Sequence, residues 1–192
     1  MIELVSPKLL DVVLADLSAK LEGIAWLDTA YGKASKQYIY KERIDVRGRT
    51  NQYFSYKDLA YPAIRVVGDD YINLFPNEKL GNYSWFHVFG RQDIEQLTQD
   101  KYRYEVPMSI IFFWDYRKVY NDPDGYSIEN IKYDILQAIK SHNNIKVDSW
   151  EEDPESVFRG YDARETEVKH YMYPYGVVRL NCSISWFDYK NC

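Results

Sequence analysis

Two stretches of the chain repeat apolar residues at the three- and four-residue spacing of an amphipathic helix. The first runs from about Pro7 to Glu22, with Ser6 as a good N-cap before Pro7 and Gly23 as a natural stop. Its apolar residues are Leu9, Leu10, Val13, Leu14, Leu17 and Leu21. A stripe this wide predicts packing on a larger surface, for which a sheet is the expected partner. A helix that binds a separate partner is the alternative.

The second helical stretch runs from about Ser127 to Ser141, after the turn-forming segment Asn121 to Gly125. Ser127 is placed to cap it. The apolar side is formed by Ile128, Ile131, Ile135, Leu136 and Ile139. We therefore expect two amphipathic helices that cover the same sheet.

Two long strands are expected, and alternation of apolar and other residues marks the second of them most clearly. From Gly176 to Asp188 one face carries Val178, Leu180, Cys182, Ile184 and Trp186, and the other carries Val177, Arg179, Asn181, Ser183 and Ser185. This is typical of a half-buried antiparallel strand with one mostly polar face. From Arg103 to Tyr116 both faces are apolar at the centre, which predicts cover on both sides. Pro107 places the first half of this strand at an edge or a bulge.

Shorter strands are expected at Gln37 to Tyr40, at Tyr61 to Val67 with Pro62 near its start, and at Ile145 to Trp150. The basic, glycine-containing segment Val46 to Thr50 reads as a loop or hairpin tip.

Residues 68–103 look like an insertion. We expect one short strand in it, from about Ser84 to Phe89, and a short helix from Asp93 to Gln99. The order helix, strands, helix, strands predicts an α+β fold. We expect a mixed, largely antiparallel sheet with two main helices packed on one face, in a single domain over residues 1–192.

Composition and charge narrow the functional classes. The chain has 192 residues, 46% of them hydrophobic, which is enough for a full core without disulfide bonds. Its two cysteines, Cys182 and Cys192, are expected to be reduced thiols. The net charge of −5 disfavours a sequence-specific nucleic-acid binder. No segment reads as a signal peptide or as a membrane span.

Candidate chemistry is sparse. There is no glycine-rich phosphate loop and no C-x-x-C pair. Glu167 and His170 have the i, i+3 spacing of a metal-ligand pair, and Asp122 and Asp124 resemble part of a calcium loop, but a surface pair and a plain turn are the simpler interpretations. The acidic run Glu151 to Glu155 offers a pair of catalytic carboxylates or a solvated loop. We predict no catalytic residues, no cofactor and no metal, and therefore no enzyme.

Two segments carry opposite charge. The segment from Lys36 to Arg65 contains seven basic and three acidic residues. The segment from Asp148 to Glu167 contains eight acidic and two basic residues. They are either two solvated loops or complementary patches for self-association. For the second case the expected interface residues are Arg43, Arg47, Arg49, Glu151, Glu152, Glu155, Tyr161 and Tyr171. The two tyrosines belong to an unusually large set of 19, a residue suited to interfaces.

The layout resembles the tail-terminator and tail-completion proteins of long-tailed bacteriophages. The resemblance is carried by the opening helix Pro7–Glu22, by Tyr61-Pro62-Ala63-Ile64 entering a strand, by the strand and helix over residues 103–141, and by the closing strand from Tyr175-Gly176-Val177-Val178-Arg179-Leu180. It implies a homo-oligomeric ring, for example a hexamer, that closes the tail tube and joins it to the head. Its partners would be copies of itself, tail tube proteins and neck proteins. It would be assembled in the host cytoplasm and located in the virion.

Two alternatives stay open. Tyrosine and tryptophan also stack on sugars, which would suit an aromatic-rich sugar- or peptide-binding module. A small enzyme would need a pocket with His87 or His170 beside a carboxylate.

Overall fold

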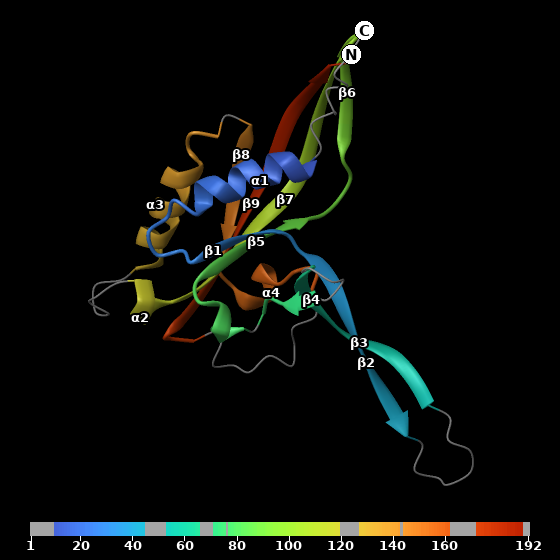
Figure 1. The fold of residues 1–192 in the computed structure, drawn as a ribbon, viewed down its shortest axis with the longest axis vertical. Helices are drawn as coiled ribbons and strands as arrows, with labels where there is room; N and C mark the ends of the chain where they lie inside the picture. Colours follow the sequence, from blue (N-terminus) through green and yellow to red (C-terminus); the bar gives the residue numbers. More distant parts are fainter. Residues whose placement is uncertain are drawn as a thin grey trace, which may run out of the picture.

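The computed structural model describes residues 10–44, 53–65, 71–75, 77–119, 127–142, 144–161 and 172–189 (Figure 1). The helical elements are α1 (Leu10–Leu21), the 3₁₀ turn η1 (Glu78–Leu80), α2 (Tyr116–Val119), α3 (Ile128–Ile139) and α4 (Pro154–Val157). The strands are β1 (Thr29–Lys33), β2 (Ser35–Ile44), β3 (Tyr53–Arg65), β4 (Tyr71–Asn73), β5 (Tyr83–Val88), β6 (Asp93–Thr98), β7 (Lys101–Asp115), β8 (Ile145–Glu151) and β9 (Tyr175–Tyr189).

Strand β7 organises the main sheet. It pairs with β9 along its whole length, and on its other side it pairs first with β6 and then with β5. The sheet has the order β1-β5-β7-β9-β8, with β6 added beside β7. Only the pairing of β1 with β5 is parallel. The predicted α+β class with a mixed, largely antiparallel sheet is therefore confirmed.

Both long helices cover the same face of this sheet. The residues that α1 buries are Val13, Leu14, Leu17 and Leu21, and those of α3 are Ile131, Ile135 and Ile139. They join one apolar core with the even-numbered residues of β7 from Val106 to Trp114 and with Val178 to Trp186 of β9. The predicted packing of two helices on one face is confirmed. Ser127 occupies the N-cap of α3 as expected, although its side chain makes no capping hydrogen bond.

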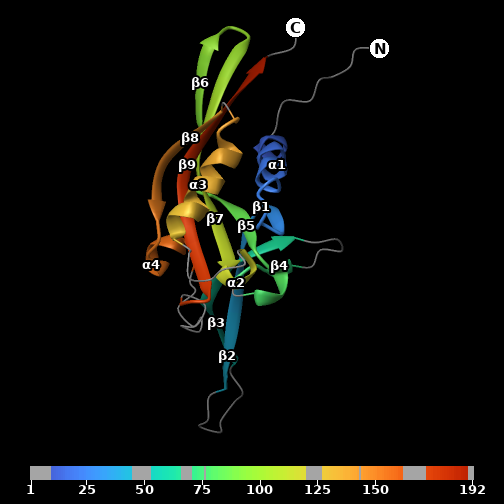
Figure 2. The ribbon, with the colours of Figure 1, turned by 90° about the vertical axis from the view of Figure 1, so that its left-hand side faces the viewer.

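The opposite face carries a second, smaller core under α4. Figure 2 shows α1 and α4 on opposite sides of strands β7 and β9. Phe75 stacks on Phe158 with ring centroids 4.1 Å apart, and its ring also meets Phe113 edge-on. Trp85 and Val157 belong to the same cluster. Cover on both sides explains why the centre of β7 is apolar on both faces.

Two arms extend from the body at opposite ends (Figure 1). One is built from β2, which begins just after β1, and β3; the two pair antiparallel over ten residue pairs. Strand β4 completes this three-stranded sheet. The other consists of β6 with the first part of β7 and the last part of β9. We call this second arm, residues 93–105 with 185–189, the β6 arm.

The helix expected at Asp93 to Gln99 is wrong, because these residues form β6. Ile94 and Leu97 have helical spacing, but neither is buried, at 60% and 42% exposed. An apolar pair that packs on nothing gives a helix little stability. Backbone pairing with residues Lys101 to Glu105 of β7 determines the structure instead.

Both prolines in strands lie where a missing N–H is harmless. Strand β3 begins at Tyr53, so Pro62 lies well inside it and not near its start as predicted. The carbonyl of Pro62 accepts from the N–H of Leu74, just beyond the last residue pair with β4. The expectation that Pro107 places the first half of β7 at an edge or a bulge is wrong, because residues 101–105 lie between β6 and β9. Pro107 itself lies where β7 changes partner from β6 to β5, a point at which no pairing on that side needs its N–H.

Residues 68–103 contain three strands, β4, β5 and β6, and not the one short strand that was expected. Strand β5 lies inside the main sheet between β1 and β7. The segment is thus integral to this molecule, and its description as an insertion relative to other proteins stays a prediction. The expected N-cap at Ser6 and Pro7, the hairpin tip Val46 to Thr50 and the turn Asn121 to Gly125 lie outside the described residues. Within the described part of the chain, no helix is both long and apolar enough to span a bilayer.

Candidate functional site

A group of polar side chains lies buried on the second face of the sheet. Neighbouring strands bring together His87 of β5, Ser109 of β7, and Arg179 and Asn181 of β9. His87, Ser109 and Arg179 are all buried, with only 3% of Arg179 exposed. We call these four residues the arginine cluster.

The guanidinium of Arg179 is satisfied mainly by neutral oxygens. Its Nε donates to Ser109 Oγ at 2.8 Å and to Asn181 Oδ1 at 3.1 Å. Its Nη1 donates to the carbonyls of Val157 at 3.1 Å and Arg159 at 2.8 Å, with a longer contact to that of Ser156. Burial lowers the pKa of Arg179. The side chain therefore clamps the segment around α4 onto the sheet.

His87 is neutral in this environment. Burial and the nearby charge of Arg179 lower its pKa to about 4, from an ordinary value of 6.5. Its Nδ1 lies 3.4 Å from Nη2 of Arg179, and its ring lies 4.6 Å from that of Tyr161. The Ser109 hydroxyl donates to Asn181 and not to His87. These contacts form neither a serine–histidine pair nor a histidine–carboxylate pair, so they do not activate a nucleophile.

The acidic run splits across the sheet. Glu151 accepts from Asn181 Nδ2 at 2.9 Å and pairs with Arg159 at 3.3 Å on the second face. Glu152 instead pairs with Lys132 of α3, on the helix side. Glu151 is the last residue of β8 and Glu152 follows it, and their carboxylates pair on opposite sides of the sheet, so they do not converge on one substrate atom.

The predicted interface residues are only partly described. Glu151 and Glu152 are already paired within the subunit, Glu155 is exposed in α4, and Tyr161 lies half-buried against His87. Arg43 lies in β2, opposite Phe54 of β3. Arg47, Arg49 and Tyr171 lie outside the described residues. The structure does not test whether the basic and acidic regions meet between subunits, and that contact stays a prediction.

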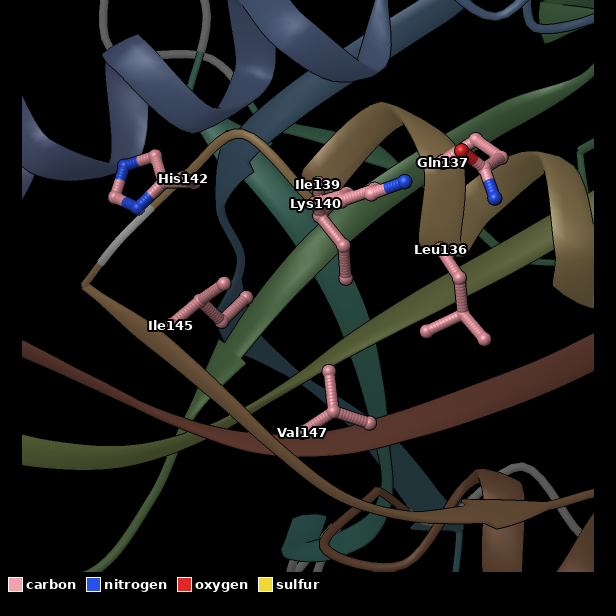
Figure 3. A pocket seen from close by; sticks show the side chains of 7 residues that line it. All are labelled: Leu136, Gln137, Ile139, Lys140, His142, Ile145 and Val147. Atoms are coloured by element: carbon pink, nitrogen blue, oxygen red, sulfur yellow. The ribbon is translucent and has the colours of Figure 1, made fainter.

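A surface groove of about 330 Å³ separates the end of α3 from β8 (Figure 3). Leu136 and Val147 point toward each other across it, and Ile139 and Ile145 supply the remaining apolar wall. Lys140 lies beside Ile139 on α3, and His142 lies apart from it, beyond the end of the helix (Figure 3). Leu136 and Val147 are 36% and 38% exposed, so this groove is an apolar surface open to a partner.

The described part of the chain contains no group of three or more histidine, cysteine, aspartate or glutamate residues that could hold a metal ion. Glu167, His170, Asp122 and Asp124 lie outside it. Cys182 is buried, and burial raises the pKa of its thiol to about 12. This thiol remains protonated and unreactive at neutral pH.

The sequence patterns did not predict the arginine cluster, the groove or the β6 arm. Alternation placed Arg179 on the polar face of its strand, which is correct, but it did not show that the α4 segment covers that face. A single arginine among small polar residues in a long strand was the available signal. No model of a known protein family matches the sequence, and no curated protein matches it either.

Proposed function

We propose that this protein is a non-catalytic virion assembly protein that acts like a phage tail terminator. It forms a ring that closes the tail tube and joins it to the head. The observation that carries the proposal is the β6 arm, which extends beyond the two-layered body and exposes Ile94, Leu97 and Phe187 by 60%, 42% and 44%. Monomeric soluble proteins rarely display apolar residues on a projecting edge, because such edges associate.

The β6 arm is built to hold its shape. Tyr104 and Trp186 stack across β7 and β9 with ring centroids 5.3 Å apart. On the other face the Lys101 ammonium lies 4.4 Å from the centre of the Phe187 ring, and Arg103 pairs with Glu105 at 3.0 Å. A preorganised arm loses little entropy on binding, which favours a role in contact between subunits or with neighbouring proteins.

The remaining features agree with a structural role. The only buried histidine among the described residues is held by an arginine and not by a carboxylate. The other arm, β2 with β3, projects from the opposite end of the body (Figure 1). Two arms at opposite ends suit a subunit that touches different neighbours above and below its own ring.

The sugar- or peptide-binding alternative needs aromatic rings presented to a ligand. All five tryptophans are described, and each lies in or against one of the two cores: Trp26, Trp85, Trp114, Trp150 and Trp186. The tryptophans therefore do not form a stacking platform, and the exposed rings left for one are those of tyrosines such as Tyr133 and Tyr173.

The test is to measure the mass of the purified protein and its effect on tail tubes. Sedimentation and native mass spectrometry should detect a discrete oligomer, either free or after addition of tail tubes that lack a terminator. Electron microscopy should then show one ring at a tube end and tubes that stop growing. A protein that stays monomeric with tubes present, and leaves tube length unchanged, would contradict the proposal.

A matched pair of variants adds a control. Leu97→Asp changes the β6 arm, and Tyr133→Asp changes an α3 residue that is 62% exposed. Both should keep the parent melting temperature, because surface substitutions cost little. Only Leu97→Asp should weaken assembly; equal behaviour of the two variants would remove the arm from the interface.

A further inference from the structure

The α4 segment, residues 153–161, is held on the second face of the sheet by two kinds of contact. Val157 and Phe158 pack into the second core. Arg179 supplies polar contacts, since its Nη1 donates to the carbonyls of Val157 and Arg159. None of the residues of this segment belongs to the helix-side core that α1 and α3 cover. The segment can therefore leave the sheet without disturbing the packing of the two long helices.

His87 binds the other end of the same guanidinium. Its Nδ1 lies 3.4 Å from Nη2 of Arg179. A guanidinium has donors only, so Nδ1 accepts this hydrogen bond and the ring proton lies on Nε2. A second proton, on Nδ1, removes the acceptor and places two positive charges side by side. The contact therefore changes from attractive to repulsive when the imidazole takes up a proton.

The ring of His87 lies directly against the α4 segment. A Cβ added to Gly160 would lie 2.6 Å from Cε1 of the imidazole, so the backbone of this glycine covers the ring closely. The ring of Tyr161 lies 4.6 Å from that of His87, and the ring of Phe89 lies 5.6 Å from it. Only 6% of His87 is exposed. Water reaches a charged imidazolium only if this cover moves away.

The groups around His87 do not compensate a positive charge. Burial, Arg179 of β9 and Lys36 of β2 together lower the pKa of His87 to about 4. Tyr161 faces the ring from the α4 segment, and burial raises the pKa of its hydroxyl to about 12, so it is neutral. Glu151 of β8 is already engaged by two other side chains. Among the described residues, no carboxylate pairs with His87.

We propose that the contact between His87 and Arg179 fastens the α4 segment in an acid-sensitive way. One proton on His87 releases residues 153–161 from the sheet, while the helix-side core stays folded. Opening uncovers the rings of Phe75 and Trp85, on which Phe158 stacks. The change takes place within one subunit and does not rest on the proposed ring.

The direction of the pH dependence follows from the two states of the segment. When the segment is open, His87 is hydrated and titrates near its ordinary pKa of about 6.5. When the segment is closed, the pKa of His87 is about 4. The closed state is therefore fully favoured above about pH 6.5 and is lost progressively as the pH falls toward 4.

Amide hydrogen exchange of the full-length chain at pH 7 and pH 5 tests this inference. The lower value lies above the ordinary pKa of carboxyl groups, about 4, so most carboxylates keep their charge. After correction for the intrinsic effect of pH on exchange, protection of residues 153–161 should fall at least about tenfold, since the opening equilibrium shifts by up to about tenfold per pH unit. Peptides from α1 and β7 should keep their protection. Unchanged protection of the α4 segment overturns the inference, and so does an equal fall in α1 and β7, which is global unfolding.

A matched pair of histidine variants identifies the group that titrates. In His87→Gln the amide oxygen still offers an acceptor to Arg179 but takes up no proton. Protection of the α4 segment should then change less than about twofold between the two pH values. His142→Gln, at a histidine that follows α3, should keep the response of the parent. If His87→Gln responds as the parent does, His87 is not the sensor and the inference fails.

Tryptophan fluorescence of the parent keeps the test decisive even if His87→Gln does not fold. Trp85 is the tryptophan of the second core, and the other four lie in or against the helix-side core. Emission should shift to longer wavelength between pH 7 and pH 5, and Trp85→Phe should lose that shift. Constant emission from the parent overturns the inference. A shift that persists in Trp85→Phe also overturns it, because the change then lies in the helix-side core.

Discussion

The buried Arg179 side chain offers a prediction whose size can be worked out from its contacts. Arg179→Met keeps much of the length and apolar volume of the side chain but removes every donor. The carbonyls of Val157 and Arg159 then lose partners at 3.1 and 2.8 Å. A buried acceptor left without a partner costs ~1–3 kcal/mol, so the two together cost roughly 2–6 kcal/mol.

Two effects reduce this cost. Methionine does not have to be desolvated as a guanidinium does, which offsets part of this cost. Ser109 and Asn181 also keep each other as partners, at 2.8 Å. We therefore expect the free energy of unfolding to fall by about 1–4 kcal/mol, with most of the lost order in the segment around α4.

Urea unfolding measures the first quantity, and amide hydrogen exchange of residues 153–161 measures the second. Arg159→Met is the control, because this arginine is 69% exposed and makes one ion pair, at 3.3 Å, with Glu151. That change should cost less than ~1 kcal/mol. If Arg179→Met is no more destabilising than the control and leaves exchange unchanged, the clamp described here does not hold the α4 segment.

Three further outcomes are expected. Leu14 is 2% exposed, so Leu14→Asp should lower the free energy of unfolding in urea by at least ~3 kcal/mol. Val12→Asp, on the exposed side of the same helix, should be nearly neutral. Equal effects of the two changes would refute the packing of α1. Gly176→Ala should cost ~1–3 kcal/mol, because the new Cβ would lie 2.3 Å from the buried Trp114 ring; an unchanged melting temperature would show that the ring moves easily. In the folded protein the pKa of His87 is about 4, below its ordinary value of 6.5. The neutral histidine therefore makes its full contribution to the free energy of unfolding above about pH 6.5. That contribution is lost as the pH falls toward 4, by at most ~1.4 kcal/mol per pH unit. His87→Gln should lose this slope in unfolding measured between pH 7 and pH 4, and a slope equal to that of the parent would show that the histidine does not titrate as described.

Local periodicity was enough to determine the main elements of this protein. The apolar stripes of α1 and α3 repeat at helical spacing, and every second residue is apolar from Val106 to Trp114 of β7 and from Val178 to Trp186 of β9. In such long segments every residue favours the same structure, so the two faces of each strand could be assigned before the fold was known. The two-layered arrangement, with both helices on one face, followed because each stripe must be buried against something large.

The tertiary structure decided what short or isolated patterns leave open. Residues 93–98 have helical spacing, but their pairing with β7 outweighs it because the two apolar residues find nothing to pack against. Arg179 reads as an exposed residue of a polar face until the α4 segment, more than 20 residues earlier in the chain, folds over it. The groove and the β6 arm likewise depend on which strands end at the sheet edges, a property of the whole strand order and not of any segment.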